Sequence, residues 1–171
     1  MPMTTSQAQA TAELERLDRQ YQDLLTSLAG ADWERPGTIG GGDWSLRDLV
    51  GHIMSWEELA LGAISAAEAG GPAPWPEGDI DEINREMVAI QSQLPLEELR
   101  RRASSTHLQL IKTISELPPA TWEMAASVGD DPPLELGELV GRVVGAGDHP
   151  FGHLTAHLGD LRSFAEASAT S

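Results

Sequence analysis

The sequence predicts an all-α fold, a four-helix bundle with an additional short helix, in a single domain that spans residues 1–171. Apolar residues recur at helical spacing along most of the chain, and no segment shows the alternation and β-branched enrichment of a strand. Proline and glycine stand between the periodic segments. Short connections between long amphipathic helices favour antiparallel packing. The length is about that of one domain, which is enough to bury a substantial core.

The first helix is predicted over residues 6–29, and Gly30 is expected to end it. Its apolar stripe consists of Leu14, Leu17, Tyr21, Leu24, Leu25 and Leu28. A loop over residues 31–43 follows and contains Gly40-Gly41-Gly42. The second helix is predicted from Ser45, an N-cap residue with Asp48 three residues later, to about residue 69.

The second half of the chain is divided by prolines and glycines. A Pro/Trp-rich connection over residues 72–76 leads to a helical region over 80–117, interrupted at Pro95. Residues 121–133 are expected to form a loop. Two shorter helices follow, over 134–144 and 150–167, and Pro150 suits the first turn of the last one.

Composition excludes several classes of function. The net charge is −16 and the chain has one lysine, so nucleic acid is not an expected partner. The short basic cluster Arg100-Arg101-Arg102 is interpreted as a solvated helix face. No membrane span or secretory signal is visible, which predicts a cytoplasmic protein with no membrane partner. The absence of cysteine excludes thiolate ligands, so any metal must be held by imidazole and oxygen.

The histidines indicate a metal site. His153 and His157 lie one helical turn apart, and two imidazoles so spaced can chelate one ion. The glutamate of the HExxH protease motif is absent. His52 lies on the predicted second helix, among residues that face the core. Three imidazole ligands leave a position for water or substrate, and zinc and nickel are the favoured metals.

Other polar and aromatic residues are weaker candidates. Asp160 is a candidate to orient a ligand imidazole, and its alternative is a solvated carboxylate. Trp56 and His149 are candidates to line the pocket, although His149 is more simply placed at the entrance of the last helix. His107 and Glu57 are expected on the surface. The glycine run before Trp44 and the 72–76 segment either border the pocket or serve only as connections.

Two segments resemble a known family. The segment Trp44-Ser-Leu-Arg-Asp-Leu-Val-Gly-His52-Ile-Met-Ser-Trp56-Glu57 resembles the second-helix signature of the DinB-like (DinB/YfiT) superfamily, in which a tryptophan precedes the helix. The segment His153-Leu-Thr-Ala-His157-Leu-Gly-Asp160-Leu161 resembles the later HxxxH helix of that family. The order and separation of the motifs also match, so the resemblance covers essentially the whole chain.

The resemblance implies an up-down-down-up bundle, usually a homodimer, with a metal held at the positions of His52, His153 and His157. Members with a known activity include thiol-dependent S-transferases that use bacillithiol or mycothiol, and mycothiol-dependent maleylpyruvate isomerases. We therefore expect a metal-dependent enzyme that transfers a low-molecular-weight thiol to a small electrophile, or a related detoxification activity.

Two alternatives stay open. The order of His52, Trp56, Pro74-Trp75, Asn84 and the late histidines is also similar to the ClbS/DfsB-like branch, which includes a hydrolase that opens a cyclopropane without an obvious metal requirement. The chain would then be a metal-independent hydrolase or sequestering protein. The other alternative is a non-catalytic binding or dimerisation module whose histidines fill a polar core. The metal-site hypothesis is favoured because histidine occupies all three ligand positions. No catalytic side chain is assigned.

Overall fold

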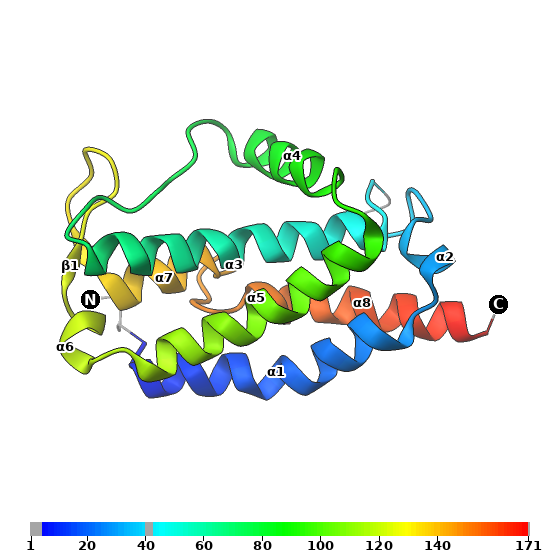
Figure 1. Ribbon diagram of the computed structural model, residues 1–171, viewed down its shortest axis with the longest axis horizontal. Helices are drawn as coiled ribbons and strands as arrows, with labels where there is room; N and C mark the ends of the chain where they lie inside the picture. The colour runs from blue at the N-terminus through cyan, green and yellow to red at the C-terminus, as the bar shows by residue number, and fades with distance from the viewer. Residues whose placement is uncertain (1–4, 40–42, 171) are drawn as a thin grey trace.

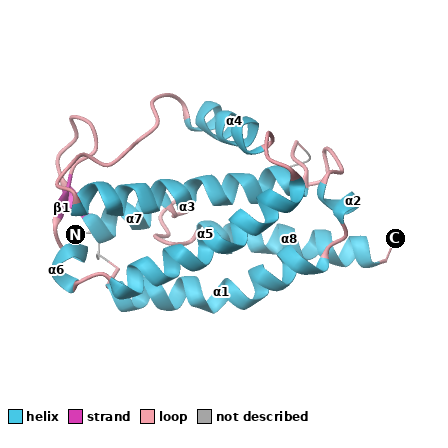
Figure 2. Cartoon of the chain, viewed as in Figure 1, coloured by secondary structure: helices cyan, strands magenta, loops and turns pink. Residues whose placement is uncertain are grey.

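The computed structural model describes residues 5–39 and 43–170, and it shows the predicted helical bundle (Figures 1 and 2). Figure 1 shows α1 and α8 running in one direction and α3 and α5 in the other, which is the up-down-down-up order. The all-α prediction is confirmed. The bundle consists of four long helices, α1 (Gln7–Ser27), α3 (Leu46–Glu68), α5 (Leu96–Glu116) and α8 (His153–Ala169).

Shorter elements cover the sides and both ends of the bundle, with α2 at one end and α6 and β1 at the other (Figure 1). In the described part of the chain they are α2 (Gly30–Trp33), α4 (Ile80–Gln91), α6 (Pro119–Trp122), α7 (Leu136–Val143), and the antiparallel strands β1 (Ala125–Ala126) and β2 (Leu134–Glu135). The prediction of a plain loop over 121–133 was therefore wrong at its start. Strands of two residues carry no alternation that a sequence pattern can reveal.

Most helix boundaries agree with the prediction. Ser45 and Asp48 form a reciprocal capping box at the start of α3, as expected. Pro95 separates α4 from α5, also as expected. The predicted end of the first helix was wrong. The helix α1 ends at Ser27, and Gly30, which was expected to terminate it, is the first residue of α2.

The last helix begins later than predicted. Its first residue is His153, with Gly152 at the N-cap position, so Pro150 lies in the preceding loop and not in the first turn. The backbone of Phe151 has a φ of 61°, a left-handed conformation that cannot belong to a right-handed helix. Residues 150–152 therefore form a turn that the HxxxH spacing did not reveal.

The central helix α3 is covered on several sides. It packs against α4, α5, α7 and α8, and residues 49–57 are all buried. The apolar side chains form two clusters. One is centred on α7 and the C-terminal half of α3, and the other joins α2, the N-terminal half of α3, and α8. A site built on the middle of α3 is therefore held rigidly by its neighbours.

None of the described helices combines the length and the apolar composition that a membrane crossing requires. Gly40-Gly41-Gly42, which the sequence suggested as a border of the pocket, lies outside the described residues. The residues on either side of this run are described, and Ile39 and Trp44 pair through backbone hydrogen bonds of 3.0 and 3.2 Å.

Candidate metal centre

The structure brings His52, His153 and His157 together. One ligand atom from each imidazole lies within 4.8 Å of the other two. The Nε2 atoms of His52 and His153 are 2.9 Å apart, so one ring donates a hydrogen bond to the other. The three rings meet edge to face, with centroids 4.8 to 5.3 Å apart. His52 comes from the second turn of α3, and the other two histidines come from the first two turns of α8.

The environment keeps these imidazoles neutral. Burial, together with the neighbouring His157, lowers the pKa of His52 to about 3. Burial, together with His52 and His157, lowers the pKa of His153 to about 3 as well. Burial also lowers the pKa of His157, and the charge of Asp160 offsets part of that effect. Neutral imidazole is the form that binds a metal, so all three side chains are in the ligating state at neutral pH.

The cluster fits a divalent ion. Zinc–nitrogen distances of about 2.0–2.1 Å in a tetrahedral site place two nitrogen ligands roughly 3.3 Å apart, so small ring movements would admit the ion between His52 and His153. The Nδ1 atoms of these two rings are buried and have no hydrogen-bond partner among the described residues. An imidazole-only donor set suits zinc and nickel, and three ligands leave a coordination position open.

A cavity of about 220 Å³ lies beside the histidines and provides space for a small molecule. Two indoles, Trp56 and Trp75, stand in its wall with ring centroids 6.2 Å apart. The Trp56 Nε1–H donates a 3.0 Å hydrogen bond to the Asn84 side-chain oxygen. The lining consists of His52, Trp56, Trp75, Ile80, Asn84, Arg142, Val143, Gly145 and His153. The 72–76 segment therefore borders this cavity through Trp75, and Trp56 also lies in its wall.

Trp44 supports the first histidine from outside the cavity. Its ring lies 4.9 Å from the His52 ring, centroid to centroid. The backbone pairing of Trp44 with Ile39 fixes this indole just before α3. The sequence motif placed Trp44 before the helix, but only the fold shows that it packs on the imidazole.

The remaining candidates lie outside the cluster. Asp160 is exposed and makes no hydrogen bond to an imidazole among the described residues, so it acts on His157 through its charge. His149 is exposed and is not among the three clustered histidines. It lies in the turn before α8, where its backbone pairs with that of Ala146.

The prediction that His107 and Glu57 lie on the surface was wrong. His107 is fully buried and Glu57 is 3% exposed, and their side chains are joined by a 2.6 Å contact between Nδ1 and Oε1. Burial would lower the pKa of His107, but the hydrogen bond and charge of Glu57, with Asp18, outweigh that effect and raise it. Burial raises the pKa of Glu57, although His107 opposes part of that rise. Glu57 lies about 140° around α3 from His52, so this pair is separate from the histidine cluster.

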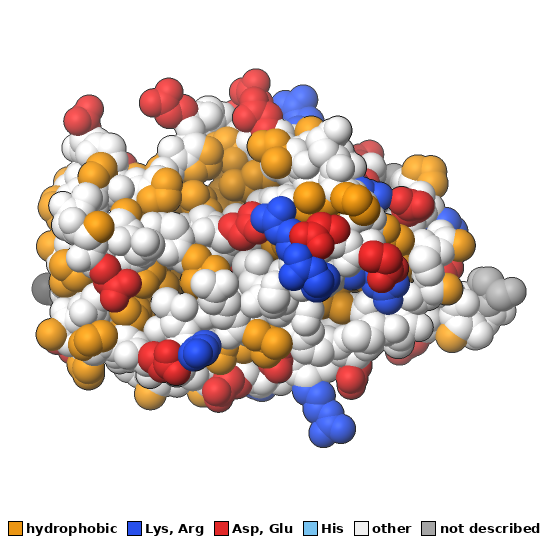
Figure 3. Space-filling model, in the orientation of Figure 1, with side chains coloured by type: hydrophobic (Ala, Val, Ile, Leu, Met, Phe, Trp, Pro, Cys, Tyr) orange, Lys and Arg blue, Asp and Glu red, His pale blue; other side chains and the backbone are white. Residues whose placement is uncertain are grey.

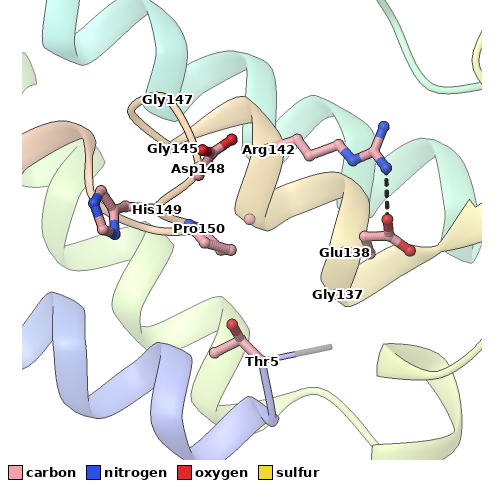
Figure 4. Close-up of a pocket in the computed structure, with 10 residues that line it drawn as sticks. Thr5, Gly137, Glu138, Arg142, Gly145, Gly147, Asp148, His149 and Pro150 are labelled. Carbon is pink, nitrogen blue, oxygen red and sulfur yellow. Dashed lines mark hydrogen bonds and ion pairs between the residues drawn. The ribbon is translucent and has the colours of Figure 1, made fainter. Parts of the chain in front are cut away.

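A larger cavity, of about 470 Å³, lies between α7, the loop over 145–150 and Thr5 (Figure 4). Its wall contains His149 at one end, and the 2.6 Å ion pair between Glu138 and Arg142 at the other. None of the three clustered histidines lines it. Its size therefore does not make it the site of metal chemistry.

Comparison with known proteins places the chain in a family. The model of the mycothiol maleylpyruvate isomerase N-terminal domain matches residues 14–145, which include His52 but end before His153 and His157. The chain belongs to this family, and its fold is that of the DinB-like proteins. A search of curated proteins yields no match.

Solved structures share the fold at low sequence identity. The crystal structure of the mycothiol-dependent maleylpyruvate isomerase aligns with a TM-score of 0.70 and 16% identity over 93% of this chain. This chain spans 63% of the length of that isomerase. An uncharacterised protein from Escherichia coli UTI89 aligns with a TM-score of 0.74 and 16% identity, covering 96% of this chain and 95% of that one. The colibactin self-resistance protein ClbS, in complex with a double-stranded DNA, aligns with a TM-score of 0.69 and 15% identity, covering 95% and 96%.

Proposed function

We propose that this chain is a metal-dependent enzyme in which His52, His153 and His157 hold one divalent ion, zinc or nickel. The observation that carries the proposal is the convergence of three neutral imidazoles, within 4.8 Å of one another, beside a cavity. The proposed reaction is the transfer of a low-molecular-weight thiol to a small electrophile. The mycothiol dependence of a structural neighbour, the maleylpyruvate isomerase, supports this choice.

Different residues around the proposed metal would have different roles in the reaction. A bound divalent ion would lower the pKa of a thiol and favour the thiolate, which is the nucleophilic form. Trp56 and Trp75 provide apolar walls to the cavity, and the buried Trp56 shields one side of it from water. Arg142 lines the same cavity with its guanidinium paired to Glu138 at 2.6 Å, so an anionic group of the substrate would have to compete with that carboxylate. Asn84 fixes the Trp56 indole.

The pKa values argue against an acid–base role for the histidines. A general acid or base works best with a pKa near the operating pH. The pKa values of His52 and His153 lie at about 3, so these rings carry no proton to donate as imidazolium at neutral pH. A metal-independent hydrolase would need another proton donor, and a non-catalytic module gives no reason for three neutral imidazoles to converge beside a cavity. Metal ligation is therefore the favoured role.

The test is the metal content of the purified, tag-free protein and of single alanine variants. We expect about one equivalent of metal in the unmodified chain, as three-ligand sites hold one ion. His52→Ala, His153→Ala and His157→Ala should lose it. His149→Ala is the matched control, because His149 precedes the same helix but is exposed and outside the cluster. A metal-free protein that does not bind added zinc, nickel, iron or manganese would overturn the proposal.

The reaction is tested separately. The metal-loaded protein is incubated with mycothiol and an electrophile such as an alkyl halide or a conjugated enone, and thiol consumption is followed. Thiol consumption above the uncatalysed rate that disappears in His153→Ala supports thiol transfer. Metal binding without any thiol consumption across a panel of electrophiles would retain the metal site and overturn the transferase assignment.

The charge distribution makes nucleic acid an unexpected partner, although ClbS shares the fold and was solved with DNA. Arg100, Arg101 and Arg102 each form an ion pair with a glutamate, at 3.0, 2.6 and 2.7 Å. Figure 3 shows basic and acidic side chains intermixed on the face of the molecule that it draws. These pairs neutralise the basic cluster in a chain of net charge −16. We expect no binding of duplex DNA in fluorescence anisotropy at physiological salt. Binding that weakens with salt would contradict this expectation.

Homodimer formation and a cytoplasmic location also stay predictions. The first follows from the family resemblance and is measured by light scattering on the eluting peak of a size-exclusion column.

A further inference from the structure

The turn that leads into α8 contains a strained residue. Among residues 5–39 and 43–170, Phe151 is the one non-glycine residue with a positive φ, at 61°. An L-residue in this conformation brings its Cβ close to the following carbonyl oxygen, so the surrounding structure must hold it there. Phe151 is two residues before His153, the first residue of α8.

The Phe151 ring is closely packed between Trp122 and Gly141, a site that we call its seat. The residue is 2% exposed, and its ring stacks on Trp122 with centroids 6.0 Å apart and an interplanar angle of 24°. On the other side lies Gly141 of α7, where an added Cβ would come within 2.9 Å of the phenyl ring. Trp122 has a similar seat, because a Cβ on Gly137 would come within 2.4 Å of the indole. Two glycines one helical turn apart on α7 thus make room for both rings.

Backbone hydrogen bonds join the same turn to α7. The N–H of Phe151 donates to the Gly141 oxygen at 3.1 Å, and the N–H of His153 donates to the Val144 oxygen at 3.0 Å. The N-cap residue, Gly152, provides no side-chain cap to the helix. The N-terminus of α8 is therefore attached to α7, while the rest of the helix packs against α1 and α3. His153 lies on the first turn of α8 and His157 on the next, so the placement of this helix N-terminus determines where both imidazoles lie.

We infer that Phe151 is a positioning residue of the metal centre: its ring, seated between Gly141 and Trp122, holds the left-handed turn that aims His153 and His157 at His52. This inference rests on the proposed metal site. It assigns to an apolar residue that touches no metal a role that is usually filled by hydrogen-bonding groups around the ligands. A substitution that disrupts the packing of the Phe151 ring should displace His153 and His157 together.

The test compares zinc affinity, measured by competition with a chromophoric chelator, among variants that change the seat. Phe151→Leu removes the stacked ring, and Gly141→Ala crowds the seat from α7 and leaves the ring in place. Outer-shell changes typically weaken metal binding by about 10–100-fold, and we expect a loss of that size in both variants. Phe164→Leu is the matched control, since Phe164 is another buried phenylalanine, 7% exposed, that lies on α8 about two turns beyond His157 and packs in the other apolar cluster.

A second comparison separates an effect on the placement of His153 and His157 from an effect on general stability. The melting temperatures of the metal-free proteins should fall by similar amounts in Phe151→Leu and Phe164→Leu, while zinc affinity falls only in the first. Because a leucine leaves space beside residue 141, the double variant Phe151→Leu/Gly141→Ala should bind zinc more tightly than the product of the two single losses predicts.

The outcomes distinguish this inference from the proposed function. An unmodified chain that binds no zinc overturns the metal site and this inference with it. Zinc binding by the unmodified chain with equal affinity in Phe151→Leu and Gly141→Ala overturns the inference alone. Equal losses in Phe151→Leu and Phe164→Leu also overturn it, because the effect would then follow core stability and not the aim of α8.

Discussion

Replacing His107 with leucine should destabilise the metal-free protein by about 3–5 kcal/mol, the usual cost of leaving one member of a buried ion pair alone. The partner, Glu57, is 3% exposed, and its Oε1 lies 2.6 Å from the His107 Nδ1. Its Oε2 has no hydrogen-bond partner among the described residues. The leucine variant therefore leaves a buried carboxyl with no partner, which must either stay charged or bind a proton.

The double variant Glu57→Met/His107→Leu should recover most of this loss. Replacing a buried ion pair by apolar residues of similar volume is often neutral or stabilising by about 1–4 kcal/mol. The pair lies between α3 and α5, with Asp18 of α1 3.7 Å from the His107 Nε2. Asp18 is partly exposed and keeps access to water, and the other neighbours are mostly apolar, so two apolar side chains have partners to pack against. We expect the double variant to be at least as stable as the unmodified chain to within about 1 kcal/mol.

Urea unfolding at neutral pH, followed by far-ultraviolet circular dichroism, measures these differences. With a slope of about 1–3 kcal/mol per molar urea, the loss in His107→Leu corresponds to a midpoint shift of roughly 2 M. His149→Leu is the control, since His149 is exposed and its replacement should stay within about 0.5 kcal/mol. A loss below about 1 kcal/mol in His107→Leu would refute the reasoning, as would a double variant no more stable than the single one.

Two further predictions concern stability. The pKa values of His52 and His153 lie at about 3 in the folded chain, below the value of 6.5 expected when unfolded, so the unfolded chain binds more protons in this window. The stability from these groups is complete above pH 6.5 and should fall, in the metal-free protein, by up to about 1.4 kcal/mol per histidine per pH unit as the pH drops toward 3. Urea unfolding over this range should show a shallower dependence in His52→Leu, and an unchanged slope would contradict the burial of that ring. Separately, Ser45→Ala removes the capping box of α3 and should cost about 1 kcal/mol in thermal unfolding. Ser65→Ala, at an exposed position in the last turn of the same helix, should cost nothing measurable, and equal effects would exclude the cap as the cause.

The sequence was informative where the signal is local. The HxxxH spacing of His153 and His157, and the Ser45 cap that sets the phase of the helix carrying His52, depend on neighbours a few residues away. Glu57 and His107 show why the rest could not be predicted. Each looked like an ordinary charged or polar position on an amphipathic helix, but α3 is covered on several sides, and that depends on how remote helices pack.

The prediction of where the last helix begins was wrong for a related reason. Pro150 is compatible with a first helical turn, and nothing in its immediate neighbours contradicts that placement. The left-handed turn at Phe151 is fixed by Gly141 and Trp122, which are distant in sequence. The pocket residue Arg142 was missed because a single arginine on a short helix carries no motif.

The pairing of the arginine cluster with glutamates would affect how fast a metal reaches the proposed site. With those positive charges neutralised locally, the surplus of acidic groups behind the net charge of −16 sets the long-range potential around the protein. Such a potential concentrates divalent cations near the surface and repels free thiolates. Ionic strength should therefore slow the association of the metal and speed the arrival of an anionic thiol. The salt concentration of an assay would then decide which of the two encounters limits the rate.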